Sequence, residues 1–148
     1  MELKNLKSLN SPSNNLTEPL KKLYLEIGSE ARLGELLAKF YKKMATDILL
    51  GFFFSGKDLD HISEQQKKFL LRAMGVTRSY EGKSPRGAHR KIPPILQGHF
   101  DRRMVLLRET LEEEGLSKEN IKTWIDFEEQ FRKSIVEKEA PLSQRRPR

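Results

Sequence analysis

A glutamine on an otherwise apolar helix face is the first residue of this 148-residue chain whose type and position indicate chemistry. Residues 59–75 have the spacing of a helix, and its inward positions are Ile62, Gln66, Phe69 and Ala73. Burying an amide without a hydrogen-bonding partner costs about 1–3 kcal/mol, so Gln66 requires a polar partner. A second polar side chain, Tyr41, lies beside the apolar stripe of an earlier helix, formed by Leu33, Leu36, Leu37, Phe40 and Met44.

Three histidines, His61, His89 and His99, could bind a metal or carry a proton. His89 ends the glycine- and proline-rich sequence Pro85-Arg86-Gly87-Ala88-His89, and such a turn can bring a short side chain close to a flat cofactor. From the residues alone, a surface or structural role is commoner for a lone histidine. His99 falls in the first turn of a helix, where the macrodipole disfavours a cation, so we expect it to be structural or exposed. Two interior polar side chains and a histidine in a turn together predict a cavity for a polar ligand.

The elements that must position these residues are predicted to be helices. In the first half of the chain, helices are expected over residues 17–28, from Ser29 or Glu30 to about Ala45, over a short apolar piece at 47–54, and over residues 59–75. In the second half, one helix passes through Phe100 and ends at Gly115. The last helix is capped by Ser117 and has the apolar stripe Trp124, Phe127, Phe131 and Ile135. Regular structure is not expected over residues 76–96, a long segment for so small a domain. Neither a strand pattern nor an internal repeat occurs, so the predicted fold class is all-α.

The composition limits the class of protein. The chain has no cysteine and 36% hydrophobic residues, which predicts one domain without disulfides or thiolate metal sites. The longest apolar run, residues 48–54, is far shorter than the roughly 20 residues of a membrane span. The amino-terminal residues are rich in Asn and Ser and lack the apolar region of a signal peptide. We therefore expect a cytoplasmic protein with no membrane partner.

The net charge of +7 lies mainly at the ends of the chain. Residues 1–22 carry +2 and the last nine residues carry +3, which leaves +2 for the rest. A nucleic-acid interface would instead cluster Lys and Arg on a folded element, so no nucleic-acid partner is predicted. The expected organisation is a flexible extension over residues 1–16, a folded domain over 17–139 and a flexible basic tail over 140–148.

Several short sequences occur in an order and at separations that resemble a known family. They are Leu23-Tyr24-Leu25-Glu26-Ile27-Gly28, Phe40-Tyr41, Phe53-Phe54-Ser55-Gly56, Gln66, Phe69-Leu70, Tyr80-Glu81-Gly82, Ala88-His89 and His99-Phe100-Asp101. Over residues 23–136 this pattern is nearly ungapped and resembles the truncated (two-over-two) haemoglobins. The pair Tyr41 and Gln66 resembles the distal pair of group I, whereas Pro93-Pro94 and His99-Phe100-Asp101-Arg102 resemble group III.

The resemblance implies a two-over-two helical sandwich around haem b, with the proximal helix reduced to a short turn, and it makes residues 17–139 a globin domain. It implies that His89 is the proximal iron ligand and that Tyr41 and Gln66 hydrogen-bond the distal ligand. The residues implied to contact the haem are Phe54, Ile62, Phe69 and Tyr80. Lys57 and Arg86 are candidates to pair with the propionates, and a solvated role is equally open to them; His61 is expected at the haem edge or in solvent.

The chain departs from the family pattern at three places. Gly75-Val76 stands where a double glycine is usual, and Gln65 stands where group I often has a basic residue near a propionate. Arg103 falls where an apolar haem-contacting residue is expected. The pairing of the last two helices must accommodate this arginine.

Tyr41 and Gln66 are both donors, and a hydrogen bond to a charged group contributes roughly 1.5–3 kcal/mol. One such bond to a partly anionic dioxygen would slow its escape about 10- to 150-fold. Two donors favour oxygen chemistry over transport, and the resemblance implies oxidation of nitric oxide to nitrate with the help of a reductase. The expected ligands are dioxygen, nitric oxide and carbon monoxide. Two alternatives remain: a haem protein that stores oxygen or senses a gas, and a haem-free helical module that binds anionic partners through its basic tails.

Overall fold

The fold is described by a computed structural model for residues 17–77 and 93–136, and every regular element in these ranges is helical. The elements are α2 (Thr17–Ile27), α3 (Glu30–Ala45), the 3-10 turn η2 (Gly51–Phe54), α4 (Leu59–Ala73), α6 (Gln97–Glu113), α7 (Lys118–Glu129) and α8 (Arg132–Ile135). The predicted all-α class is confirmed. The predictions made for residues 1–16, for the tail and for most of the irregular segment lie outside the described residues.

Polar side chains fix where the helices begin. Ser29 Oγ accepts the backbone N–H of Arg32 at 3.1 Å, and Ser117 Oγ accepts that of Asn120 at 3.2 Å. Such N-caps satisfy amide groups that have no partner within the helix. At the start of α6, the N–H of Leu96 donates to His99 Nδ1 at 3.0 Å. His99 therefore has a structural role, as its position in the sequence predicted.

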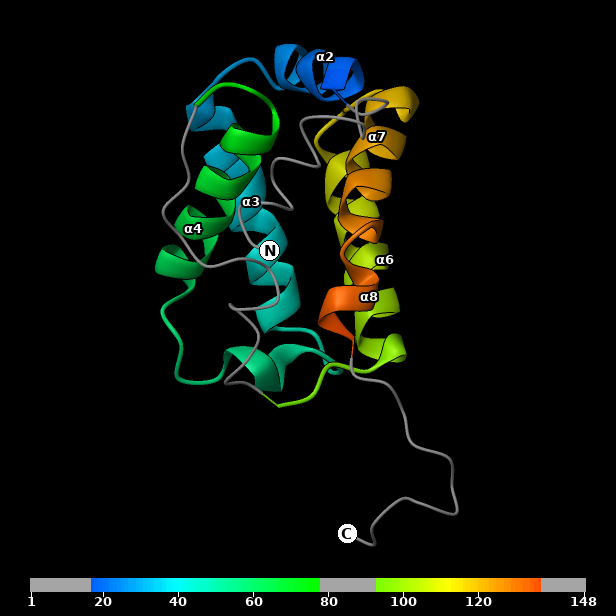
Figure 1. Ribbon diagram of the computed structural model, residues 1–148. Helices are drawn as coiled ribbons and strands as arrows, with labels where there is room; N and C mark the ends of the chain where they lie inside the picture. The colour runs from blue at the N-terminus through cyan, green and yellow to red at the C-terminus, as the bar shows by residue number, and fades with distance from the viewer. Residues whose placement is uncertain (1–16, 78–92, 137–148) are drawn as a thin grey trace, which may run out of the picture.

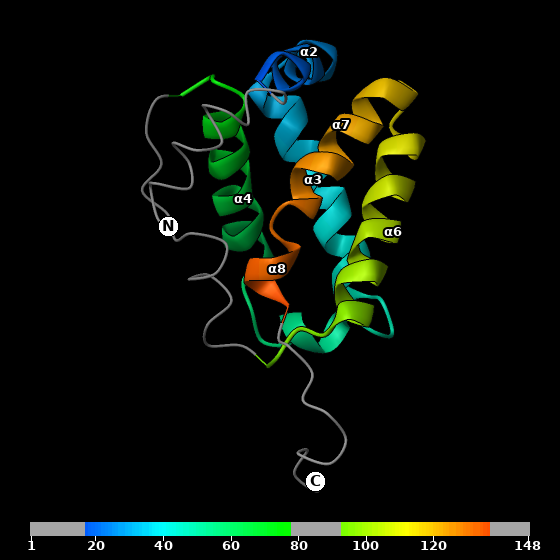
Figure 2. The ribbon, with the colours of Figure 1, turned by 45° about the vertical axis from the view of Figure 1, so that its right-hand side comes forward.

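The helices stack in two layers, with α3 against α4 in one and α6 against α7 in the other. Helix α3 packs on both α4 and α6, and it lies between them in Figures 1 and 2. Helix α2 packs on α7 and crosses one end of the two layers (Figure 1). The α3·α6 contacts join the layers, and the α2·α7 contacts attach α2 to one of them, which is the arrangement expected of a two-over-two sandwich.

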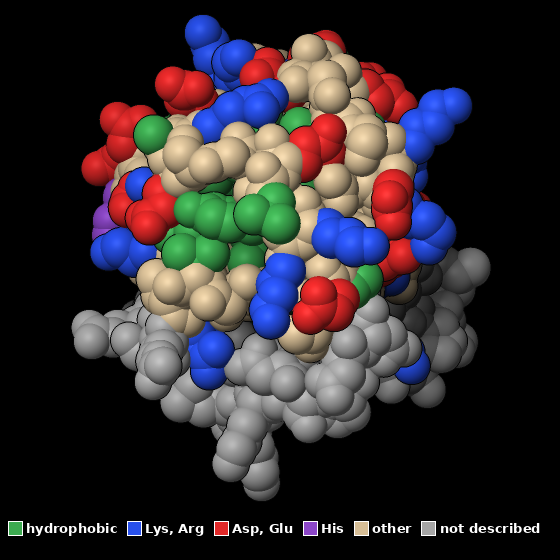
Figure 3. Space-filling view, turned by 90° about the horizontal axis from the view of Figure 1, so that it is seen from above, with side chains coloured by type: hydrophobic (Ala, Val, Ile, Leu, Met, Phe, Trp, Pro, Cys, Tyr) green, Lys and Arg blue, Asp and Glu red, His purple; other side chains and the backbone are tan. Residues whose placement is uncertain are grey.

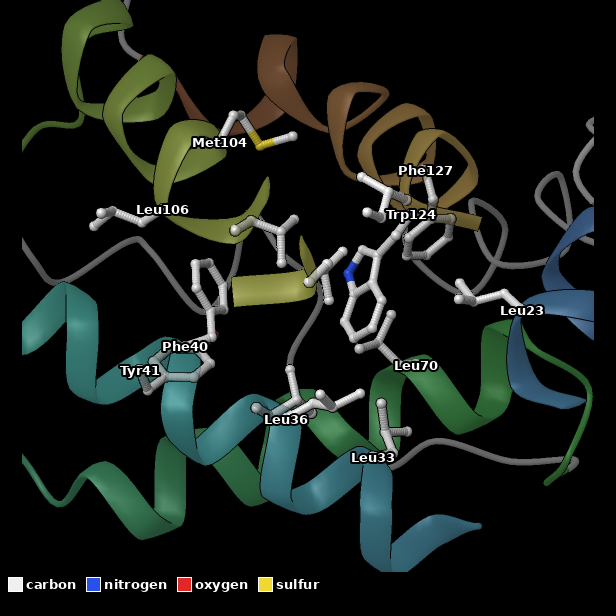
Figure 4. Packing of buried hydrophobic residues seen from close by; sticks show 14 of the residues in the cluster. Leu23, Leu33, Leu36, Phe40, Tyr41, Leu70, Met104, Leu106, Trp124 and Phe127 are labelled. Carbon is white, nitrogen blue, oxygen red and sulfur yellow. The ribbon is translucent and has the colours of Figure 1, made fainter. Parts of the chain in front are cut away.

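The core lies between the layers and is built largely from aromatic and leucine side chains. Trp124, Phe40 and Phe127 are the largest fully buried residues, and Figure 4 shows Trp124 reaching from α7 toward Leu70 of α4. The predicted inward stripe of α3 is confirmed, since all its members are buried: Leu33, Leu36, Leu37, Phe40, Tyr41 and Met44. On α4 the stripe is less covered, because Phe69 is buried while Ile62, Gln66 and Ala73 are only half-buried.

Two predicted helices are shorter than the sequence pattern indicated. The piece expected over residues 47–54 is helical only at Gly51–Phe54, because Asp47 Oδ2 accepts the N–H groups of Leu49 and Leu50 and so competes with a helical turn. The last predicted helix is interrupted at residues 130–131, between α7 and α8. There an i→i+3 bond from Phe131 N to Glu128 O tightens the chain, and Phe131 packs edge-on against Phe127.

Charges of both signs are interspersed on the face seen in Figure 3, around a small apolar area. Ion pairs join separate elements elsewhere: Arg102 of α6 pairs with Asp47 at 2.8 Å, and Lys39 of α3 pairs with Glu114 at 2.7 Å. Within the described ranges, no helix combines the length and the apolar character needed to cross a membrane.

Glu26 of α2 forms hydrogen bonds to residues at the start of α7. Its carboxylate accepts the N–H and the hydroxyl of Ser117 at 3.0 and 3.1 Å, and it also accepts the side-chain amide of Asn120. The Asn120 amide, followed by Ser117, holds the pKa of Glu26 below its usual range, against the opposing effect of burial. The ionised form of Glu26 is thus the one that stabilises the fold.

Replacing Glu26 with Gln should lower the free energy of unfolding at pH 7 by about 1 kcal/mol, after allowance for solvent screening at a partly exposed site. Because the pKa of Glu26 is lowered in the folded state, its contribution is present above the ordinary value of 4.5 and is lost as the pH falls through the folded pKa. Urea denaturation at pH 7 and pH 3 measures this, with Glu18→Gln on the exposed face of α2 as the matched control. An equal loss at both pH values would contradict an electrostatic role.

Candidate functional site

Tyr41 is a buried phenol on the inward face of α3. Its residue surface is 7% exposed, and its ring packs 5.4 Å from that of Phe40 and 5.9 Å, edge-on, from that of Phe54. Burial raises the pKa of Tyr41 above its usual range, despite the opposing charge of Arg103. The hydroxyl consequently stays protonated at neutral pH and can donate a hydrogen bond.

Gln66 meets the partner that its burial required. Its Nε2 donates to Glu128 Oε2 at 3.3 Å, across the interface between α4 and α7. A primary amide has two N–H donors, and this bond occupies one of them. Within residues 17–77 and 93–136 the other N–H has no protein partner, so it can donate to a ligand.

Glu128 is a buried carboxylate that gathers donors from three helices. It is 6% exposed, and its Oε1 accepts Arg103 Nη1 of α6 at 2.6 Å. Its Oε2 accepts the indole Nε1 of Trp124 at 3.2 Å as well as the Gln66 amide. A buried carboxylate is tolerated only when paired and hydrogen-bonded in this way. We call Tyr41, Gln66, Arg103, Trp124 and Glu128 the buried polar cluster.

Arg103 lies beside Tyr41 in the buried polar cluster, and each side chain influences the pKa of the other. Its side chain is 20% exposed, and its Cζ lies 5.0 Å from the centroid of the Phe40 ring, within the range of a cation–π contact. Burial disfavours the charge, yet Glu128 and Tyr41 together hold the pKa of Arg103 above its usual value. The guanidinium is thus a permanent cation beside the Tyr41 hydroxyl.

The structure brings together some of the predicted site residues and leaves others untested. Tyr41 and Gln66 belong to one cluster, and Phe54 contacts the Tyr41 ring. Phe54 and Ile62 are half-buried at the margin of the core, and Phe69 is buried against Phe127 and Phe131. Lys57 and His61 are exposed. Tyr80, Arg86 and His89 lie outside the described residues, so their predicted roles remain predictions.

The sequence interpretation missed Glu128 and the polar role of Trp124. A signal was present, because Glu128 lies four residues after Trp124 and thus falls on the buried stripe of α7. Arg103 was recognised as a departure from an apolar position, and the structure supplies its reason: the arginine faces a buried carboxylate.

The chain resembles proteins that are already characterised. The sequence profile of the bacterial-like globin family matches residues 22–137. The group 1 truncated hemoglobin of Tetrahymena pyriformis is 32% identical over 116 residues, which cover 78% of this chain and 95% of that protein. The group 1 truncated hemoglobin of Synechocystis is 32% identical over 102 residues, which cover 67% and 82%.

Solved structures show the same likeness. The Fe(III) form of the Tetrahymena pyriformis protein superposes with a TM-score of 0.71 at 31% identity, covering 78% of this chain and 98% of that one. A 2/2 hemoglobin from a Synechococcus species, in the cyanomet state with covalently attached heme, gives a TM-score of 0.70 at 28% identity, covering 77% and 97%. The chain therefore belongs to the truncated haemoglobins, group I, and has their two-over-two globin fold.

Membership of this family makes the chain a haem globin, a class of protein that binds diatomic gases. The described residues fit such a cofactor. Phe54 and Ile62 present partly exposed apolar surface suited to a flat macrocycle, and Phe69 lies on the same face of α4. Beside them, the buried polar cluster supplies O–H and N–H donors suited to a polar ligand. The family leaves the haem-free alternative without support.

Replacing Glu128 with Ala should destabilise the fold by about 3 kcal/mol, because Arg103 would lose its counter-charge in a largely buried position. This is the lower end of the range for broken buried pairs, since the Arg103 side chain keeps 20% exposure. Urea denaturation checks the value, and Glu112→Ala, on an exposed position of α6, is the control. Equal stabilities for the two variants would mean that the ion pair contributes nothing.

Proposed function

We propose that this globin holds haem b through His89 and uses Tyr41 and Gln66 to bind dioxygen tightly for oxygen chemistry, such as oxidation of nitric oxide to nitrate. The observation that supports this is the buried polar cluster, in which the Gln66 amide and Arg103 both bind Glu128 and the protonated Tyr41 hydroxyl lies beside Arg103. Keeping these groups inside costs free energy that apolar residues would not. A ligand-binding role accounts for their presence.

The haem, when bound, supplies the coordination position for a diatomic gas and gives dioxygen the electron density that makes it a hydrogen-bond acceptor. Tyr41 can donate its O–H, since its raised pKa keeps the proton in place. Gln66 can donate the N–H that Glu128 does not occupy, while the bond to Glu128 fixes the orientation of the amide. The two side chains are thus held in place before a ligand arrives, which lowers the entropy cost of binding.

Two hydrogen-bond donors beside the bound gas favour oxygen chemistry over oxygen delivery. Each hydrogen bond of about 1.5–3 kcal/mol slows dissociation about 10- to 150-fold, and a slow release is unsuited to delivery. Nitric oxide, dioxygen and one electron together give nitrate, and a reductase would return the electron. Catalytic consumption of nitric oxide with a reductase supports this reaction, whereas binding without turnover would support storage or gas sensing. Such chemistry is expected in the cytoplasm.

The cofactor contacts are assigned by their place in the family pattern. His89 follows Gly87-Ala88 in the sequence, and a neutral imidazole suits iron. Phe54, Ile62, Phe69 and Tyr80 would contact the macrocycle. Lys57, which is exposed, and Arg86 would pair with the propionates at the surface.

Replacing His89 with Ala should abolish stable haem incorporation or leave a weakly bound pigment, because neither other histidine is suited to replace it. His99 is engaged with the backbone at the start of α6, and His61 is exposed. The Soret absorbance per protein after purification measures the haem content, and His61→Ala is the control. Loss of haem in His99→Ala but not in His89→Ala would show that the proximal assignment is wrong.

Replacing Tyr41 with Phe should raise the dioxygen dissociation rate by roughly 10- to 150-fold, because it removes one donor at nearly constant volume. Carbon monoxide is a much weaker acceptor and should respond far less. Gln66→Leu should act in the same direction, and the double variant should be non-additive because both groups belong to the buried polar cluster. Stopped-flow measurement of both gases decides this, and equal effects on the two would indicate a steric role.

A further inference from the structure

We propose that Arg103 is a third ligand-side residue of this site and that its charge, held in position by Glu128, makes the ferric protein selective for small inorganic anions such as azide. This inference rests on the proposed function, because it places Arg103 beside the groups assigned to the ligand. It goes further in naming a charged selectivity residue and the class of ligand that the residue favours.

The position of Arg103 is fixed from three sides. Nη1 is bound to Glu128 Oε1 at 2.6 Å, the guanidinium lies over the Phe40 ring at 5.0 Å, and the neighbouring Tyr41 helps to raise the pKa of Arg103. The neighbouring Arg102, whose side chain is 37% exposed, pairs instead with Asp47. The two adjacent arginines therefore pair with different carboxylates, and only the carboxylate that pairs with Arg103 also binds Gln66.

The Arg103 guanidinium has N–H donors that its contacts within the described residues do not use. Nη1 donates to Glu128 and touches Met104 Sδ at 3.9 Å, whereas Nε and Nη2 donate to no carbonyl or carboxylate oxygen within residues 17–77 and 93–136. A guanidinium has five N–H groups, so several remain for the Tyr41 hydroxyl and for a ligand beside it. A hydrogen bond from such a group to an anion is charge-assisted and is stronger than a neutral one.

Glu128 opposes Arg103 electrostatically while positioning it. The carboxylate is 6% exposed, so solvent screens its charge weakly, and it partly cancels the field of the arginine. Removing the cation should weaken anion binding, and removing the carboxylate charge should strengthen it. A purely structural ion pair would instead change anion binding in the same direction whichever partner was neutralised.

The test uses the ferric holoprotein and azide as the anionic probe, with binding followed in the Soret band. Arg103→Met should weaken azide binding at least about tenfold, and Glu128→Gln should tighten it about tenfold. Arg103→Lys should retain most of the affinity. Arg102→Met is the matched control, since it removes a charge one residue away and should leave azide affinity unchanged.

Carbon monoxide binding to the ferrous form reports access and pocket shape, and it should change by less than about threefold in these variants because the ligand is neutral. If Arg103→Met does not fold, the cation can be tested in a protein that lacks the carboxylate charge. Glu128→Gln keeps the arginine, and the double variant Arg103→Met/Glu128→Gln removes it, so azide should bind more weakly to the double variant. Equal azide affinities in that pair, or weaker binding in Glu128→Gln, would overturn the proposal. A wild-type protein without a Soret band would overturn the proposed function instead.

Discussion

The interior of this globin depends on one buried carboxylate. Glu128 must keep its partners, because an ionised group that is 6% exposed is stable only when donors replace the water it has lost. Its two oxygens accept hydrogen bonds from different helices. Oε1 accepts from Arg103 of α6, and Oε2 accepts from Trp124 of α7 and Gln66 of α4. Through Arg103 the same network reaches α3, because the guanidinium lies over the ring of Phe40. All four helices of the sandwich are thereby held in one relative placement.

Apolar packing and hydrogen bonding make different contributions to this core. Leucines and aromatic residues, including Phe40 and Phe127, supply the apolar burial that drives the layers together. That burial is not directional, and it tolerates small sliding movements. The hydrogen bonds of Glu128 are directional, so they define the register between α4, α6 and α7. Ligand-binding donors placed on such a framework have little freedom to turn away.

The sequence predicted those features that follow from repeating patterns. The inward stripe of α3, the caps at Ser29 and Ser117 and the all-α class depend on local spacing, and they are confirmed. The shortened η2 follows from Asp47 Oδ2, which accepts the N–H groups of Leu49 and Leu50, and hydrophobic periodicity does not reveal such a side-chain bond. At the break before α8, Phe131 packs against Phe69 of α4, a tertiary contact that no local pattern contains. Gln66 was correctly expected to need a partner, but an acceptor 62 residues away cannot be identified from periodicity alone. Only the folded chain shows that the unusual Arg103 and the overlooked Glu128 explain each other.

The indole of Trp124 provides a natural optical reporter for this interior. The chain has a single tryptophan, so its tryptophan emission comes from one place. Because Nε1 donates to Glu128 and Trp124 is 1% exposed, we expect the emission of the haem-free protein to respond to the charge and hydration of the buried polar cluster. Water entry, loss of the carboxylate charge or a shift of α7 would each alter the emission without any added label.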